Sequence, residues 1–142
     1  DILTFKNEYL LILTEYISEL FGNTFGFDEY DFLKHILNEI VKVNLNIPIF
    51  LKLHPAERSD KFDDILKNYD LKIYKDDYNI QEVLYFSKLI FGLNSSVFKE
   101  ALLLNKPIYS VQIGAKKNLE TIDTVQVIKK SKELKEVLIK NF

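Results

Sequence analysis

LIFGLNSSVFKEALLLNKPIYS, residues 89–110, is the stretch that decides the fold of this chain. It begins with a short apolar run that stops at Gly92, a pattern that predicts a buried strand. Asn94, Ser95 and Ser96 follow, and these residue types are preferred where a helix begins. Apolar residues then recur at helical spacing, and a second apolar run closes the stretch. The order strand, polar turn, helix, strand indicates a βαβ unit, which aims the start of a helix at the edge of a parallel sheet.

The two serines of this turn leave two interpretations open. The start of a helix has free N–H groups and the positive end of the helix dipole, so it attracts anions. Ser95 and Ser96 would then add two hydroxyl donors for a phosphate. In the other interpretation one serine is an ordinary helix cap and the second has no part in binding, and capping serines are common. This stretch by itself favours the second interpretation.

The composition narrows the possible functions. The chain has 142 residues, of which 47% are hydrophobic and 28% charged, so we expect one globular domain over 1–142. The formal net charge of −2 argues against nucleic-acid binding through a basic surface. Because the chain has no cysteine, thiolate metal sites are excluded, and with only His35 and His54 a multi-histidine zinc site is nearly excluded.

The sequence also bears on location. No apolar run approaches the roughly 20 residues that span a bilayer, and no segment resembles a signal peptide, so we expect a cytoplasmic domain. The sequence contains no methionine at all, so we expect it to be a piece of a longer protein.

The rest of the chain alternates between strand and helix patterns. Further apolar runs predict strands over 9–14, 47–53, 71–74 and 124–128. Helices are expected over 28–43, near 62–66, over 79–86, and after a capping Ser131. Residues 15–27 are expected to form a long loop at the end of the first strand, where α/β folds place ligands. The alternation predicts a Rossmann-like αβα domain with about six parallel strands. The GxGxxG and Walker motifs are absent, which disfavours NAD, FAD and ATP in their usual binding modes.

A lysine and a histidine end the strand predicted over 47–53. Pro55 cannot continue the ladder and restricts His54 to extended geometry, so the imidazole is held at the carboxyl end of the strand. Lys52 projects from the same face, because side chains alternate along a strand. Lys52 and His54 together could bind a phosphate. In the alternative interpretation they are only charged residues at the end of a strand and have no part in binding.

Three motifs, taken together in their order along the chain, indicate a protein family more specifically than any one of them does. Lys52-x-His54-Pro55, Glu82-Val83-Leu84 and Ser95-Ser96 together resemble the C-terminal nucleotide-binding half of GT-B glycosyltransferases. The nearest resemblance is to bacterial sialyltransferases that use CMP-sialic acid. CDP-glycerol glycerophosphotransferases are also similar, although this chain has Gly-Leu-Asn before the serines where those enzymes usually have an aspartate-rich segment.

This resemblance implies a role for each motif. Lys52 and His54, with Pro55 in the same element, would bind the donor phosphate, and Ser95 and Ser96 would complete the phosphate site. His54, if protonated, would act as the catalytic general acid toward the departing phosphate.

The resemblance also implies a ribose contact. Glu82 would bind the ribose hydroxyls, although its place in a first helical turn also fits simple helix stabilisation. Glu100 resembles an acidic position of the same families and competes with Glu82 for that role.

The implied activity needs no metal and uses a nucleotide-sugar donor, a CMP-sugar. A glycan acceptor would bind through an N-terminal domain that this chain lacks, so we expect the chain alone to be inactive. A full-length enzyme would act in the cytoplasm, with peripheral association at the inner face of the membrane as one option. Two alternatives stay open: a CDP-glycerol or other polysaccharide transferase domain, and a non-catalytic α/β binding module.

Overall fold

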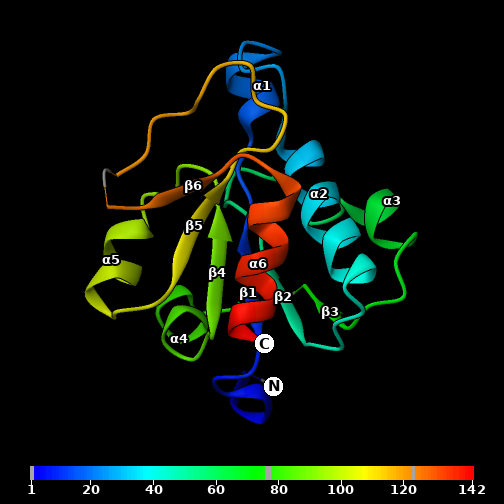
Figure 1. Ribbon diagram of the computed structural model, residues 1–142. Coiled ribbons are helices and arrows are strands. Elements are labelled where there is room, and N and C mark those ends of the chain that lie inside the picture. The colour runs from blue at the N-terminus through cyan, green and yellow to red at the C-terminus, as the bar shows by residue number, and fades with distance from the viewer. Residues whose placement is uncertain (1, 76–77, 123) are drawn as a thin grey trace.

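Short strands form one parallel sheet in the order β3-β2-β1-β4-β5-β6 (Figure 1). The computed structural model describes residues 2–75, 78–122 and 124–142. Its strands are β1 (Leu10–Leu13), β2 (Ile49–Lys52), β3 (Ile73–Tyr74), β4 (Leu89–Gly92), β5 (Ile108–Val111) and β6 (Gln126–Ile128). Every strand pairing is parallel in this part of the chain. The expected Rossmann-like α/β fold is therefore confirmed.

Helices cover both faces of the sheet (Figure 1). The helices are α1 (Ile17–Phe21), α2 (Glu29–Lys42), α3 (Asp63–Leu66), α4 (Ile80–Tyr85), α5 (Phe98–Leu103) and α6 (Ser131–Asn141), and a 3₁₀ turn spans Ile2–Phe5. Leu10 and Ile12 of β1 pack in the same core cluster as the apolar residues of α2 and α6. Leu11 and Leu13 point the other way and pack with α4 and α5. Because both faces of β1 are covered, its residues are apolar without alternation.

The longest helix begins with a reciprocal cap. The Asp28 side chain accepts hydrogen bonds from the N–H groups of Tyr30 and Asp31, and the Asp31 carboxylate accepts one from the Asp28 N–H. This capping box fixes the start of α2. Its apolar side chains face the core except that of Val41, which is 53% exposed because it lies near the end of the helix and off the buried face.

The structure differs from the sequence prediction at several element ends. Residues 15–27 are not a continuous loop, because α1 forms within them and ends at Gly22, whose φ of 56° suits glycine. The edge strands β3 and β6 are shorter than predicted, since pairing with one neighbour holds only part of each apolar run. Ser131 is the first residue of α6 and Lys130 occupies the cap position, without a side-chain cap bond.

Close packing joins β4 to α5. A Cβ atom at Gly92 would lie 2.6 Å from Cε1 of Phe98, whose ring is fully buried beneath the sheet. Glycine at this position therefore lets α5 approach the sheet. It also sets the course of the turn between β4 and α5, which carries Ser95 and Ser96 and is called the serine turn below.

We expect Gly92→Ala to destabilise the fold by about 1–3 kcal/mol, because the added methyl group overpacks the Phe98 contact. Urea denaturation with matched m-values measures this. The double variant Gly92→Ala with Phe98→Leu should recover part of the loss, since leucine frees space next to residue 92. An unchanged urea midpoint in Gly92→Ala would mean that the contact with Phe98 does not limit the size of the side chain at position 92.

Candidate functional site

The sheet has one edge where a ligand site is expected. The chain leaves β1 through α2 on one face and leaves β4 through α5 on the other, although β1 and β4 are neighbours. The loops after these two strands therefore diverge, and the crevice between them at the carboxyl edge is where open α/β sheets bind ligands.

A hollow of about 530 Å³ lies at this edge, at the end of β2. Its lining residues are Lys52, Leu53, His54, Pro55, Glu57, Ser59 and Lys75. The predicted lysine, histidine and proline are thus brought together. Lys75 adds a second ammonium group that sequence reasoning missed. It donates hydrogen bonds to the backbone carbonyl of Ser59 at 2.6 Å and to the carboxylate of Asp63, with which it forms an ion pair.

The imidazole of His54 is held from two sides. Its Nδ1 accepts a hydrogen bond from the N–H of Ala56 at 3.0 Å. Its ring lies 4.5 Å from the Tyr16 ring, centroid to centroid. Because Nδ1 is an acceptor, the neutral imidazole carries its proton on Nε2, and this N–H is the donor that remains for a ligand.

A buried carboxylate holds the loop that carries His54. Oε1 of Glu57 accepts hydrogen bonds from the backbone N–H of His54 at 2.9 Å and from the Thr14 hydroxyl at 2.6 Å. Oε2 of Glu57 lies 2.8 Å from Nζ of Lys61. Glu57 therefore ties the end of β2 to the end of β1, and it positions the backbone of His54.

Lys61 completes a buried ionic cluster. Its Nζ also donates to Glu29 at 2.7 Å, and the side chains of Lys61, Glu29 and Glu57 are 6%, 0% and 0% exposed. Glu29 in turn accepts a hydrogen bond from the Ser18 N–H at 3.1 Å. Burial alone would lower the pKa of Lys61, but its hydrogen bonds with both glutamates outweigh this and raise the pKa. The lysine therefore stays charged.

One of the two hydroxyl groups in the serine turn makes a hydrogen bond within the turn. The Ser95 oxygen accepts a hydrogen bond from the Val97 N–H at 3.2 Å, whereas Ser96 is exposed. Ser110 of β5 donates a hydrogen bond to the Leu93 carbonyl at 2.6 Å and so fixes the turn from the neighbouring strand. Because α5 has only six residues, its dipole adds little here, and any anion contact must come from the hydroxyl and amide groups.

The two predicted ribose contacts lie together in a different place. Glu82 and Glu100 both line a groove of about 630 Å³ between α4 and α5. Figure 1 shows α4 beside the foot of β4, because α4 leads directly into that strand. His54 does not line this groove, so the hollow at the end of β2 and the pair of glutamates are separate features.

Glu15 lies at the point where the loops diverge. Burial, and then the charge of Glu57, raise the pKa of Glu15 to about 7, and a hydrogen bond from the Asn94 backbone N–H opposes this rise. The carboxyl group therefore lies near Glu57 and near the backbone of Asn94. Sequence reasoning placed this residue in a loop and gave it no role.

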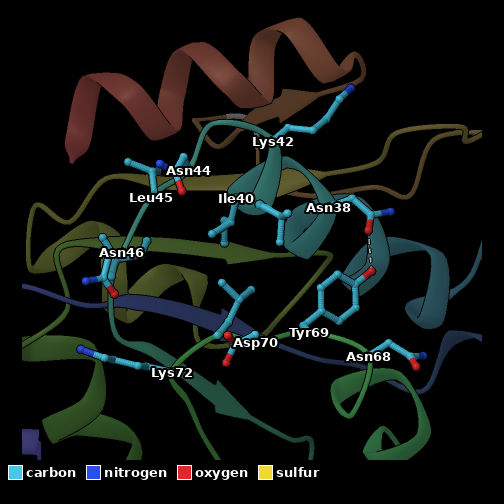
Figure 2. A pocket seen from close by; sticks show the side chains of 13 residues that line it. Asn38, Ile40, Lys42, Asn44, Leu45, Asn46, Asn68, Tyr69, Asp70 and Lys72 are labelled. Carbon is cyan, nitrogen blue, oxygen red and sulfur yellow. Dashed lines mark hydrogen bonds between the residues drawn. The ribbon is translucent and has the colours of Figure 1, made fainter.

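A larger groove, of about 980 Å³, lies at the opposite edge, where β2 and β3 begin (Figure 2). Much of its polar lining serves the backbone or a neighbouring side chain. Asn68 donates to the Asp64 carbonyl, and Tyr69 donates its hydroxyl hydrogen to Asn38 at 2.6 Å. Asn44 has a φ of 57° just after α2, where asparagine commonly ends a helix. These roles account for much of the polar lining without a ligand.

Besides Lys75, the site residues that were not predicted from the sequence are Glu57, Lys61, Tyr16 and Glu15. One signal was available: a glutamate three residues after His54 can reach back to a backbone N–H in a tight turn. The other three are brought to the site by contacts with distant segments of the chain, which local sequence patterns do not predict.

Comparison with known proteins identifies the fold. The chain is similar to KpsC of Thermosulfurimonas dismutans, a beta Kdo 2,4 transferase, with a TM-score of 0.50 and 15% sequence identity. The likeness shows that the two proteins share an α/β fold. The match covers 89% of this chain and 42% of KpsC, so the chain spans less than half of that protein. No protein-family model and no curated protein matches the sequence.

Among the residues that the structure describes, no helix combines the length and apolar character that crossing a bilayer requires.

We expect Lys61→Ala to destabilise the protein by about 3–5 kcal/mol, because it leaves Glu29 and Glu57 buried without a counter-charge. Chemical denaturation measures the loss. Lys67→Ala is the matched control: Lys67 pairs with Asp64 at 3.3 Å on an exposed surface, where ion pairs contribute little. Equal effects of the two substitutions would contradict the buried cluster.

Proposed function

We propose that this chain is the donor-binding domain of a glycosyltransferase that transfers sialic acid from CMP-sialic acid to a glycan. The observation that carries the proposal is the hollow at the end of β2, where Lys52, His54 and Lys75 meet at the carboxyl edge of the sheet. The α/β fold that the chain shares with KpsC supports it. The order of the Lys-x-His-Pro and Ser-Ser motifs along the chain supports it as well.

The proposed chemistry follows from charge. When the bond between the sugar and the CMP phosphate breaks, negative charge develops on the departing phosphate. Donors held in place beforehand stabilise this charge more in the transition state than in the ground state. His54 is suited to this role because its Nε2 is the nitrogen left for a ligand. To act as the general acid, His54 would have to take up a proton on Nδ1 and give up the hydrogen bond from Ala56. Lys52 and Lys75 would supply further positive charge, with no metal needed.

The serine turn would complete the phosphate site. Ser96 has an exposed hydroxyl, and Ser95 holds the turn through its bond with Val97. Glu82 and Glu100 keep the ribose role as a prediction, and that role requires the nucleoside to extend toward the groove between α4 and α5. The glycan acceptor would bind through a second domain that faces this edge.

Transfer of Kdo is the second candidate. It is favoured by the fold likeness to KpsC, which is named as a Kdo transferase. Both candidates place an activated acidic sugar at the same edge of the sheet, so a nucleotide-binding experiment tests the part that they share.

We expect His54→Ala to weaken binding of cytidine monophosphate by about 1.5–3 kcal/mol, the loss of one charge-assisted hydrogen bond. Isothermal titration calorimetry measures the affinity. His35→Ala is the control, because it removes the other imidazole of the chain, and it should bind as the unchanged protein does.

The melting temperature of each variant separates loss of binding from loss of folding. If His54→Ala is folded and binds cytidine monophosphate as tightly as the unchanged protein, the Lys-x-His-Pro element is only a strand end. The proposed function would then lose the observation that carries it.

A further inference from the structure

The ring of Tyr16 lies against the imidazole of His54 at the carboxyl edge of the sheet. The two ring centroids are 4.5 Å apart, and the ring planes meet at 60°. Aromatic rings at this distance and tilt attract each other beyond what burial of their surface contributes. The contact joins the segment after β1 to the end of β2, where His54 lines the hollow together with Lys52 and Lys75.

The backbone that carries each of the two rings is fixed. Thr14, two residues before Tyr16, donates its hydroxyl hydrogen to Oε1 of Glu57 at 2.6 Å. The same oxygen accepts a hydrogen bond from the backbone N–H of His54 at 2.9 Å. Ile17, directly after Tyr16, is buried in the core. One buried carboxylate thus holds both segments, and the two rings are brought together by backbone that is fixed on either side.

The imidazole is held at a second point as well. Its Nδ1 accepts a hydrogen bond from the Ala56 N–H at 3.0 Å. A single hydrogen bond at one ring atom leaves the imidazole free to tilt about that atom, and the ring of Tyr16 limits this tilt from the side. The two contacts together define where Nε2 lies. A donor that is held in place before the ligand arrives loses less conformational freedom on binding.

We propose that Tyr16 is a positioning residue for anion binding: its ring fixes the His54 imidazole so that the Nε2–H is available to a phosphate group in the hollow at the end of β2. The proposal rests on the proposed function and adds a residue to its site. The ring of Tyr16 and not its hydroxyl group has this role, because the contact with His54 is made between the rings.

The first test measures the dissociation constant of cytidine monophosphate by calorimetry. Tyr16→Leu removes the ring and keeps an apolar side chain, and we expect it to raise the dissociation constant about threefold to tenfold, the effect of having to immobilise one more side chain on binding. Tyr16→Gln is a second variant without the ring and should have the same effect. Tyr16→Phe keeps the ring and should bind as the unchanged protein does.

Phe21→Leu is the matched control. Phe21 is an aromatic residue of the same segment and is 47% exposed, but its ring contacts Phe25 instead of His54. This variant should keep the dissociation constant of the unchanged protein. Thermal melting verifies that each variant is folded.

The second test needs no ligand. The ¹⁵N chemical shifts of the two imidazole nitrogens of His54 report which of them carries the proton at alkaline pH. In the unchanged protein and in Tyr16→Phe we expect one protonated Nε2 and one unprotonated Nδ1, because Nδ1 accepts the bond from Ala56. In Tyr16→Leu the two shifts should approach each other, since the released imidazole exchanges between its tautomers. His35 serves as the internal reference. A residue that only stabilised the fold would change the melting temperature and not these shifts.

The outcomes separate this inference from the proposed function. If the unchanged protein does not bind cytidine monophosphate, the proposed function fails and the inference falls with it. If the unchanged protein binds and the folded variants without the ring bind equally tightly, the inference about Tyr16 is wrong while the proposed function stands. An equal loss of affinity in Tyr16→Phe and Tyr16→Leu would also overturn it, because the hydroxyl group would then be responsible. Weaker binding and altered nitrogen shifts only in the variants without the ring establish the positioning role.

Discussion

Lys61 lies between two carboxylates that have no exposed surface, and this buried cluster organises the carboxyl edge of the sheet. Glu29 comes from the first turn of α2, and Glu57 comes from the loop that follows His54. An ammonium group and two carboxylates are costly to bury, and the cost is offset only when each finds its partners. The cluster therefore holds the segments around His54 in one arrangement, since any other would expose an unpaired charge in the interior.

Charged groups of both signs meet at this edge. At the end of β2, Lys52, His54 and Lys75 line one hollow together with Glu57, and Lys75 also pairs with Asp63. At the crevice between β1 and β4, Glu15 faces the negative charge of Glu57. Glu57 acts on both parts of the edge, because it also accepts a hydrogen bond from the backbone N–H of His54.

The sequence predicted the parts of the fold that depend on local pattern. The βαβ unit of 89–110, the central strand β1 and the long helix α2 were expected from apolar periodicity and capping residues. The helix α1 was not, because the two glycines near it were interpreted as signs of a loop, whereas Gly22 ends the helix. The lengths of β3 and β6 depend on pairing with a single neighbouring strand, and this pairing cannot be predicted from the composition of the two segments.

The site was predicted less completely than the fold. Lys52, His54 and Pro55 share a hollow because they are adjacent in sequence at a strand end. Glu82 and Glu100 line a separate groove, which the order of motifs along the chain did not reveal. Glu57 accepts a hydrogen bond from the hydroxyl of Thr14, 43 residues away, and burial together with the charge of Glu57 raises the pKa of Glu15. Such contacts follow from the strand order, in which β1 lies between β2 and β4.

We propose that the carboxyl edge of the sheet, at His54 and the serine turn, binds a cytidine nucleotide. Titration of the ¹⁵N-labelled chain with cytidine monophosphate, followed by amide chemical shifts, is the test. We expect the largest shifts at His54, Ala56 and the residues from Asn94 to Ser96. Shifts confined to the groove of Figure 2 or to the groove between α4 and α5, or no shifts at all, would contradict the claim.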